Sequence, residues 1–599
     1  MADHKKSINR QKGGDEKARA RAQKSTRATN AGNFLDAVEN LRPSRTIFLI
    51  CVLSLLAYAN SLGGDFVFDD TDQIVENQDI RSWDNLGRAF TTHVWAFREK
   101  PQALRVPIPP PYYRPLFTVL FTVEYQLFGL WPQGWHLVSL LLHILCSVGV
   151  YYVLLLLAKR NSVAVLGALL FAVYSIHVES VSWISGVTDP LFGVFFLAAF
   201  YLYLKYRAEH RPSHLLWSLV MFALSTLSKE TALCLVLLIF CTELIEGGEE
   251  SRSVSRGTSS SGVGPKLTRA ALRTSPFLGV AVLYLIPRFL VIGGIAWDNP
   301  HTYKGPFINV LLTIPSVVCS YFLHLLWPVN LSITYFTSFE TSAASPRVLF
   351  PSLALFASLI CLCVYRKRIR REVWYGLAFL VIPLLPVLDL RKLSVEYLIF
   401  DRYLYLSVVG WVFLIAIGLA KLAESEQRRA KAAAGTVPSK HLGLSSVVAV
   451  SMILLLTVAT AMENASWANA YSLWSQAARV RPDFWVTHYN SGLALYDVKR
   501  YSESRDALMR AAALAPDEPT IFNALGQTYT AIGETSLAIE NFKHAVEIDP
   551  EMFESINNLG TISFNLGDYK SAERYFKSAL ALRPQGTDFH YNLGLCYSR

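Results

Sequence analysis

The end of the chain repeats with a period of 34 residues, and no other feature of the sequence constrains the fold as strongly. Proline and glycine mark two positions of each unit, at Pro482, Pro516, Pro550 and Pro584 and at Gly492, Gly526, Gly560 and Gly594. A unit of this length is a pair of helices that buries its apolar face only by stacking on its neighbours. The sequence therefore predicts an α-solenoid of tetratricopeptide repeats over residues 463–599.

The same pattern predicts how the solenoid begins and ends. Projected one period backward, it places Ala470, Trp474 and Ala477 on a second helix whose partner is missing, because a membrane helix takes that place. We therefore expect the solenoid to start directly at the bilayer. The last repeat stops at Arg599 without a polar capping helix, so we expect the chain to be a fragment with an incomplete final repeat.

The chain as a whole is too apolar for a water-soluble protein of its size. Of its 599 residues, 52% are hydrophobic and only 17% are charged. Before residue 463 we count about eleven to thirteen apolar runs of roughly membrane-spanning length. The predicted fold is all-α, with a basic, disordered cytoplasmic tail over 1–45, a polytopic membrane domain over 46–462, and the solenoid.

Clusters of Lys and Arg indicate which loops face the cytoplasm. They include the N-terminal tail and the run from Arg366 to Arg371. Membrane topology thus accounts for the net charge of +10, and we expect no nucleic acid partner. The other loops and the repeats then face the lumen or the exterior. We expect a multi-pass protein of the endoplasmic reticulum membrane in a eukaryote, or of the plasma (inner) membrane in a bacterium.

Two carboxylates open the longest outward loop. Asp69 and Asp70 follow the first membrane helix closely. Such residues are costly near lipid but useful in a wet cavity, where one can act as a general base while the other holds a metal or orients the base. The alternative is a solvated acidic turn. We treat Asp69 and Asp70 as candidate catalytic residues.

A second group of ionisable residues lies on a short outward connector and at the start of the next helix. It consists of His177, Glu179 and Asp189. These side chains could share a divalent cation or a proton with the first pair. Ordinary interfacial polarity explains the same spacing, and the sequence does not determine whether a metal is bound.

Three cations on the outward side suit an anionic ligand: Arg114, Lys229 and Arg402. An Arg or Lys at the mouth of a helical cavity can bind a phosphate whose lipid tail lies between the helices. The alternative is that these side chains only extend from helix ends toward water.

Together these motifs resemble the transmembrane and tetratricopeptide-repeat (TMTC) family of protein O-mannosyltransferases, and bacterial membrane proteins of the same layout. The matching segments are 64–70, 113–116, 134–138, 171–179, 228–231 and 401–406, followed by the repeats. Two positions depart from the family pattern, because Ser175 stands where Pro is common and Val187 where Arg is common.

The resemblance implies a GT-C fold and a sugar donor carried on polyprenyl or dolichyl phosphate. It also implies that Asp69 or Asp70 deprotonates the acceptor hydroxyl, and that Arg114, Lys229 and Arg402 are candidate contacts of the donor phosphate. Our main hypothesis is a membrane glycosyltransferase that moves a sugar, mannose in this family, to Ser or Thr hydroxyls of proteins held by the repeats. The expected partners are the lipid-linked donor, the membrane and acceptor proteins.

Two other functions fit parts of the sequence. A non-enzymatic membrane scaffold would use the repeats to recruit proteins, and Asp69, Asp70 and the outward cations would be dispensable. A transporter of lipid-linked sugar would favour ionisable residues at the bilayer midplane, whereas most of them lie near the outer ends of apolar runs here.

Overall fold

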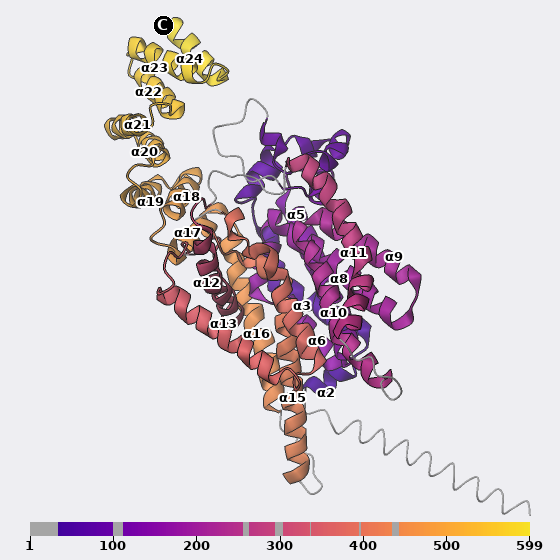
Figure 1. The fold of residues 1–599 in the computed structure, drawn as a ribbon. Helices are drawn as coiled ribbons and strands as arrows, with labels where there is room; N and C mark the ends of the chain where they lie inside the picture. The colour runs from indigo at the N-terminus through magenta and orange to yellow at the C-terminus, as the bar shows by residue number, and fades with distance from the viewer. Residues whose placement is uncertain are drawn as a thin grey trace, which may run out of the picture.

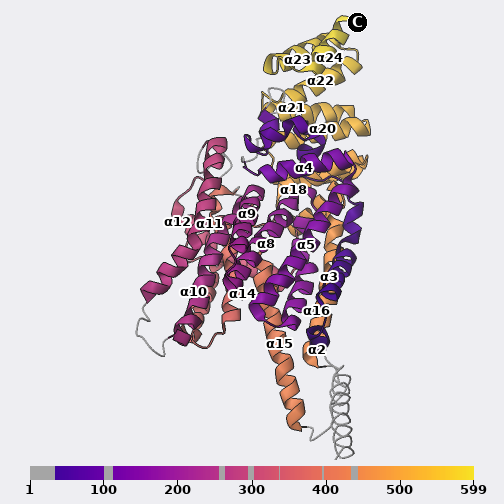
Figure 2. The same cartoon turned by 90° about the vertical axis from the view of Figure 1, so that its right-hand side faces the viewer.

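The computed structural model describes residues 34–99, 112–254, 263–293, 303–335, 337–393, 397–433 and 443–599. Within these residues every regular element is a helix or a helical turn. Figure 1 shows a bundle of long helices and a curved arm of short helices that ends at the C-terminus. The arm rises from one end of the bundle, and α15 (Ser407–Ala433) projects from the opposite end (Figure 2).

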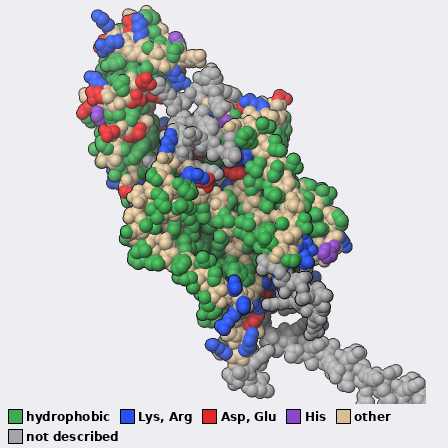
Figure 3. All heavy atoms as spheres, in the orientation of Figure 1, with side chains coloured by type: hydrophobic (Ala, Val, Ile, Leu, Met, Phe, Trp, Pro, Cys, Tyr) green, Lys and Arg blue, Asp and Glu red, His purple; other side chains and the backbone are tan. Residues whose placement is uncertain are grey.

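Nine helical segments in the described residues are long and apolar enough to cross a membrane, so the chain is a multi-pass membrane protein. They contain α3 (Pro43–Tyr58), α5 (Pro132–Ala158), α8 (Thr188–Glu209), α11 (Val263–Ile292), α12 (Phe307–Leu326), α13 (Pro346–Tyr365), α14 (Arg371–Val381), α15 and α16 (Leu444–Asn464). A bent pair makes a tenth candidate, since α6 (Asn161–Ala172) meets the segment Ser175–Val181 at 47°. Figure 3 shows hydrophobic side chains covering the middle of the bundle, with charged side chains at its ends.

This number is smaller than the eleven to thirteen helices that the sequence predicts. Three predicted runs do form helices, but α4 (Pro115–Phe128) and α9 (Pro212–Ser228) have only 14 and 17 residues. The third, α10 (Cys234–Val254), carries Glu243 and Glu246 near its middle. All three pack against other helices of the bundle, so short or charged helices are accommodated inside the protein.

The tail predicted as disordered over 1–45 contains structure in its last part. Residues 34–39 form α2 (Phe34–Glu39), which packs on α6, and α3 begins at Pro43. Leu35 and Val38 are buried in the main core, and their burial explains why this segment is ordered. Residues 1–33 lie outside the described residues.

The core of the bundle is built around α6, in which every residue from Ser162 to Ala172 is buried. α5 packs on both α6 and α8, and α15 packs on α6 and α14. α14 and α15 approach so closely that a Cβ on Gly410 would overlap the backbone of Gly376 and Leu380. These central helices form a rigid frame for the connections that carry the candidate residues.

The connections between the long helices are folded into short turns. They are η1 (Ala59–Gly63), η2 (Thr71–Glu76), η3 (Asp79–Arg81), η4 (Trp83–Phe90), η5 (Ala96–Glu99), η6 (Ser175–His177), α7 (Val178–Val181), η7 (Ile184–Val187), η8 (Glu230–Leu233), η9 (Ile382–Leu388), η10 (Leu390–Lys392), η11 (Asp401–Leu404) and η12 (Ala465–Trp467). Arg114 directly precedes α4, and every other candidate residue lies on one of these turns or within two residues of one.

The arm has the helix pairs that the 34-residue period predicts. Its helices are α17 (Ala470–Val480), α18 (Trp485–Asp497), α19 (Tyr501–Leu514), α20 (Pro519–Ile532), α21 (Thr535–Ile548), α22 (Phe553–Asn565), α23 (Tyr569–Leu582) and α24 (Thr587–Tyr597). In each pair a large side chain of the second helix faces the glycine of the first, as Phe542 faces Gly526. The phenylalanine is buried, and a Cβ on the glycine would overlap its ring. The glycine is therefore needed for close packing.

The unpaired helix α17 fixes the arm to the bundle, as predicted. Trp474 and Ala477 are buried in the main hydrophobic core. The Arg481 Nη1 donates to the carbonyl oxygen of Tyr335 at 2.9 Å, and the amide of Asp65 donates to the carbonyl of Ala468 at 2.9 Å. The first outward loop is thus bonded directly to the base of the arm.

Candidate functional site

The two adjacent carboxylates lie in different surroundings. Phe68, the residue before them, has a φ of 56°, which is uncommon for a residue with a side chain. The centroid of its ring lies 5.6 Å from that of Trp183 and 5.9 Å from that of Trp474. This aromatic packing holds the turn from which Asp69 and Asp70 diverge.

Asp70 is fully buried and fully bonded. Its Oδ1 accepts hydrogen bonds from the amide of Ser185 at 2.8 Å and from the Ser185 hydroxyl at 2.5 Å. Its Oδ2 accepts from the amide of Val67 at 3.1 Å. Burial raises the pKa of Asp70 to about 7, although these hydrogen bonds act in the opposite direction. Asp70 therefore ties the first outward loop to η7.

Asp69 is half-buried, and its carboxylate has no hydrogen bond to the described residues. Burial raises its pKa to about 7, the positive charges of Arg402 and Arg98 lower it, and Asp72 raises it. A carboxylate with a pKa near neutrality and free oxygens can accept a proton. Of the two candidates, Asp69 is the one whose oxygens are available to a ligand.

The second group of candidate residues does not share one set of contacts. Its members are His177, Glu179 and Asp189, and each contacts different partners. His177 is buried among rings, with its centroid 4.4 Å from that of Phe171 and 4.7 Å from that of Tyr405. Glu179 and Asp189 each bind a cation of the third group instead. The described residues contain no group of three His, Cys, Asp or Glu side chains that could hold a metal ion. The hypothesis of a shared divalent cation therefore does not fit this arrangement.

Each of the three predicted cations is held by a carboxylate. Lys229 Nζ lies 2.6 Å from Asp189 Oδ1, and both side chains are almost completely buried. Arg402 binds Glu179 through its guanidinium and through its backbone amide, the latter at 2.9 Å. The third pair is bidentate, with Arg114 Nε and Nη2 at 3.0 and 2.7 Å from the oxygens of Glu230.

These pairs fix the guanidinium groups without using all of their donors. A guanidinium has five N–H donors, and Arg114 and Arg402 each bind one carboxylate. The Arg402 guanidinium also lies 3.8 Å from the centroid of the Phe400 ring, which orients it further. The remaining donors can bind a phosphate, for which a planar guanidinium is well suited.

Two of the cations meet at one pocket. Its polar lining consists of Asp189, Lys229, Thr231, Arg402 and the tyrosines 403 and 405, and its apolar lining includes Phe192, Val387 and Leu406. Burial lowers the pKa of Lys229, and so do the positive charges of Arg114 and Arg402, while Asp189 raises it. Arg402 also acts on Asp69. The structure thus brings Asp69 and the three cations into one electrostatic neighbourhood beside an apolar wall.

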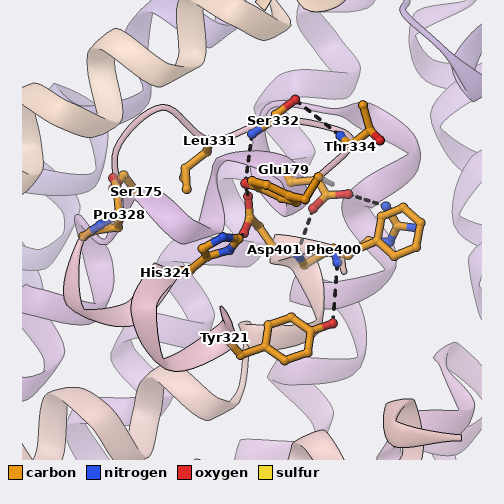
Figure 4. Close-up of polar contacts among 12 residues, drawn as sticks. Ser175, Glu179, Tyr321, His324, Pro328, Leu331, Ser332, Thr334, Phe400 and Asp401 are labelled. Carbon is orange, nitrogen blue, oxygen red and sulfur yellow. Dashed lines mark hydrogen bonds and ion pairs between the residues drawn. The ribbon is translucent and has the colours of Figure 1, made fainter. Parts of the chain in front are cut away.

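A second network of polar contacts surrounds Asp401, the residue before Arg402 (Figure 4). Asp401 accepts hydrogen bonds from the hydroxyl of Tyr335 and, at 2.9 Å, interacts with His324 Nδ1. Tyr335 in turn accepts from the amide of Ser332 at 2.9 Å. His324, Tyr335 and the role of Ser185 were not predicted from the sequence, because their partners are far away along the chain.

The two departures from the family pattern have structural consequences. The Ser175 hydroxyl donates to the carbonyl of Pro328 at 2.6 Å, a bond that a proline cannot make. Val187 is buried in an apolar cluster with Ile184 and Trp135, so position 187 offers no cation to a ligand.

Fold and site together define an all-α membrane protein in which a charged pocket lies beside the base of a tetratricopeptide arm. The profile of the family Dolichyl-phosphate-mannose-protein mannosyltransferase matches residues 109–258, and two tetratricopeptide repeat profiles match residues 519–552 and 554–583. The chain is thus similar to proteins of the transmembrane and tetratricopeptide-repeat (TMTC) family, the family that the sequence motifs resemble.

Three relatives illustrate the similarity. Human Protein O-mannosyl-transferase TMTC4 is 28% identical over 494 residues, covering 74% of this chain and 63% of that protein. Human Protein O-mannosyl-transferase TMTC3 is 23% identical, covering 90% of this chain and 60% of that protein. Protein O-mannosyl-transferase F38B6.6 of Caenorhabditis elegans is 27% identical, covering 76% and 60%. The chain spans less than two thirds of the length of each relative.

Proposed function

We propose that the protein is a membrane glycosyltransferase that moves mannose from a polyprenyl or dolichyl phosphate donor to Ser or Thr hydroxyls of proteins. One observation carries this proposal: Asp69 is a half-buried carboxylate that accepts no hydrogen bond from the described residues, beside Arg402 and close to the base of the repeat arm. The names of the relatives support the reaction.

In the proposed reaction Asp69 is the general base. The acceptor hydroxyl oxygen attacks the anomeric carbon of the sugar, and its proton passes to Asp69. The bond between that carbon and the phosphate oxygen breaks, and the phosphate leaves with the electron pair. A pKa of about 7 favours this role, because a base works best when its pKa is near the working pH.

Arg402, Lys229 and Arg114 would stabilise the leaving phosphate. Charge increases on the phosphate as the glycosidic bond breaks, so fixed cations stabilise the transition state more than the bound donor. Their carboxylate partners hold them in place before the donor binds. Asp70 would act through the loop, since its bonds to Ser185 position the turn that carries Asp69.

We also propose a function for each segment of the chain and the side of the membrane on which it lies. Residues 1–45 would be cytoplasmic, 46–462 would form a GT-C-like catalytic domain, and 463–599 would hold acceptor proteins. The basic residues Arg428 and Arg429 lie on the helix that projects from the end opposite the arm, which favours a cytoplasmic position for that end. The site and the repeats would then face the lumen of the endoplasmic reticulum.

The test compares the parent chain with Asp69→Asn and with Asp65→Asn, an exposed carboxylate in the same loop. Each purified protein receives radiolabelled polyprenyl-phosphate mannose and an acceptor protein domain, and label transferred to protein is measured. We expect Asp69→Asn to lose about a hundredfold or more of the transfer rate, and Asp65→Asn to keep it.

Two outcomes would count against the proposal. Equal transfer by Asp69→Asn and the parent would remove Asp69 from the reaction. If none of the proteins transferred label although the acceptor remained bound, the non-enzymatic scaffold would be favoured instead.

A further inference from the structure

The helix α13 is the least buried of the candidate membrane spans in the described residues. Only 6% of its apolar stretch is buried, compared with 61% for that of α15. Its main contact is with α12, and Figure 1 shows it on the outside of the bundle. Leu353, Phe356 and Ile360 are exposed along its length. Because so little of α13 is covered by protein, its side chains are accessible from the bilayer on nearly every side.

Two exposed cysteines lie close to the C-terminal end of α13. All eight cysteines of the chain are among the described residues, and all are free thiols. Cys361 and Cys363 are exposed, whereas the other six are buried or half-buried: Cys51, Cys146, Cys234, Cys241, Cys319 and Cys596. Residues two positions apart point to nearly opposite sides of a helix, so both thiols are exposed only because α13 is uncovered on both sides. These two thiols are therefore the ones that a reagent at the membrane can reach.

A run of basic residues follows the cysteines directly. Arg366, Lys367 and Arg368 are exposed. The amide of Arg368 donates to the carbonyl of Tyr365 at 2.8 Å, so the run folds back onto the end of the helix. At a rise of about 1.5 Å per residue, the two cysteines lie about 4.5 and 7.5 Å from Arg366 along the helix axis. Because basic side chains bind lipid headgroups, the thiols lie just inside the membrane surface.

This run lies at the end of the bundle that is opposite the candidate site. A Cβ on Gly376 would overlap Leu414, and a Cβ on Gly410 would overlap the backbone of Leu380, so α14 runs antiparallel to α15. α15 begins shortly after Arg402 and runs to the end from which it projects (Figure 2). The start of α14, and with it the basic run and the cysteines, therefore lies at the end that we propose to be cytoplasmic.

We propose that Cys361 and Cys363 are S-acylation sites, each of which carries a fatty acyl chain in a thioester bond. This inference rests on the proposed orientation in the membrane and does not depend on the proposed sugar transfer. Exposed thiols beside a membrane surface and a basic run are the setting in which reversible S-acylation occurs.

The reaction uses a fatty acyl thioester as donor and a membrane acyltransferase as catalyst. The cysteine sulfur attacks the carbonyl carbon of the acyl group, and a new carbon–sulfur bond forms. The bond between that carbon and the sulfur of the carrier breaks, and the carrier leaves as a thiol with the proton that the cysteine loses. The acyl chains then enter the bilayer beside α13, where each methylene group adds to membrane binding. They hold the end of a helix that has little support from the rest of the bundle.

The test counts thioesters on the full chain after expression in cultured eukaryotic cells. Free thiols are blocked with N-ethylmaleimide, thioesters are cleaved with neutral hydroxylamine, and each released thiol is coupled to a maleimide polymer that shifts the protein on a gel. We expect the parent to show two hydroxylamine-dependent additions, Cys361→Ser and Cys363→Ser one each, and the double variant none. The control is Cys319→Ser, a half-buried cysteine on the neighbouring helix α12, which should keep both additions.

A second measurement does not depend on how the variants fold. Cells that express the parent are given an alkynyl fatty acid, and mass spectrometry of the peptide with both cysteines should find the label on each. A parent without hydroxylamine-dependent additions would overturn the proposal, and so would a correctly folded double variant that kept them. A label on only one of the two cysteines would overturn the proposal for the other.

Failure of this inference can be distinguished from failure of the proposed function. The double variant of Cys361 and Cys363 should transfer sugar at the rate of the parent in detergent, because both residues lie at the opposite end of the bundle from Asp69. Asp69→Asn should still carry both acyl chains. A parent that is acylated but never transfers sugar would refute only the transferase, and sugar transfer by a parent without thioesters would refute only the acylation.

Discussion

At the scale of single residues, the difference between Asp69 and Asp70 follows from what each side chain touches. Asp70 receives three hydrogen bonds and is completely buried. Asp69 receives none from the described residues and is only half-buried. Two identical side chains in one loop thus have different roles in the proposed mechanism, one as a fixed anchor and one as a base.

The pH dependence of sugar transfer tests the role of Asp69. A general base must be ionised, and burial raises the pKa of Asp69 to about 7. We therefore expect kcat/KM to rise with pH up to about 7 and to remain constant above it. Initial rates across the pH range would show this limb, and Asp65→Asn should have the same profile. A rate that fell steadily from acidic to neutral pH would contradict a carboxylate base.

The buried hydroxyl of Ser185 should stabilise the loop that carries Asp70. In Ser185→Ala the carboxylate loses the hydrogen bond at 2.5 Å, so we expect a loss of about 1–3 kcal/mol in the free energy of unfolding. Ser180→Ala is the matched control, since the Ser180 hydroxyl is buried without a partner among the described residues. That substitution should change stability by less than about 0.5 kcal/mol. Denaturant unfolding in detergent would compare the two, and equal effects would disprove the special role of Ser185.

At the scale of elements, each pair of helices in the repeat arm depends on a glycine in its first helix. A Cβ at Gly526 would overlap the Phe542 ring, and a Cβ at Gly560 would overlap the Phe576 ring. Gly594 has the same place in its repeat, but a Cβ there would meet no atom of the described residues within 4 Å. Gly492 packs on Leu508 as Gly526 packs on Phe542, so glycine has a packing role in the three repeats whose second helix the structure describes.

This contrast gives a matched pair of substitutions. We expect Gly526→Ala to destabilise the arm by about 1–3 kcal/mol, because the methyl group must displace a packed ring. Gly594→Ala should be neutral or stabilising by up to about 1 kcal/mol, since alanine favours the helix. Thermal unfolding followed by circular dichroism would detect the difference. If both variants behaved alike, the close contact with Phe542 would not be energetically important.

At the scale of the whole molecule, the site lies where the membrane bundle and the arm meet. Trp474 of α17 contacts Phe68 beside the proposed base, and Trp467 stacks on Trp183 with their ring centroids 5.8 Å apart. The Trp183 ring also lies 5.4 Å from the Arg402 guanidinium. A chain of aromatic contacts thus joins the arm to both the base and one proposed phosphate ligand.

A weaker contact between the arm and the bundle should reduce sugar transfer to protein acceptors more than it affects the chemical step at Asp69. We expect Trp474→Ala to lower kcat/KM for a protein acceptor by about tenfold, because Phe68 loses a neighbour and the arm loses its fixed orientation. Leu566→Ala, at an exposed turn of the arm, should have little effect. Parallel assays of both variants would test this, and full activity of Trp474→Ala would show that the junction is not needed for transfer.

Much of the arrangement of helices was predictable from the sequence. The period of the repeats predicts the helix pairs of the arm, and the missing partner of α17 follows from the same pattern. The candidate site residues were selected from the sequence because charged residues beside apolar runs are conspicuous, and their roles stay predictions. Their pairing was not predictable: Asp70 and Ser185 are 115 positions apart, and Glu179 and Arg402 are 223 positions apart.

The sequence by itself determined the all-α class, the membrane bundle with its repeat arm, and the set of ionisable residues near the helix ends. These properties follow from the composition and from patterns between residues that are close in the sequence. Apolar residues recur every few positions in the helices, and the repeat unit recurs every 34 residues in the arm. Only the tertiary structure decided that Asp70 is bonded while Asp69 has no hydrogen bond within the described part of the chain, and that His177 lies among rings. Such choices depend on contacts between distant segments, where burial and pairing set the energy of each charge.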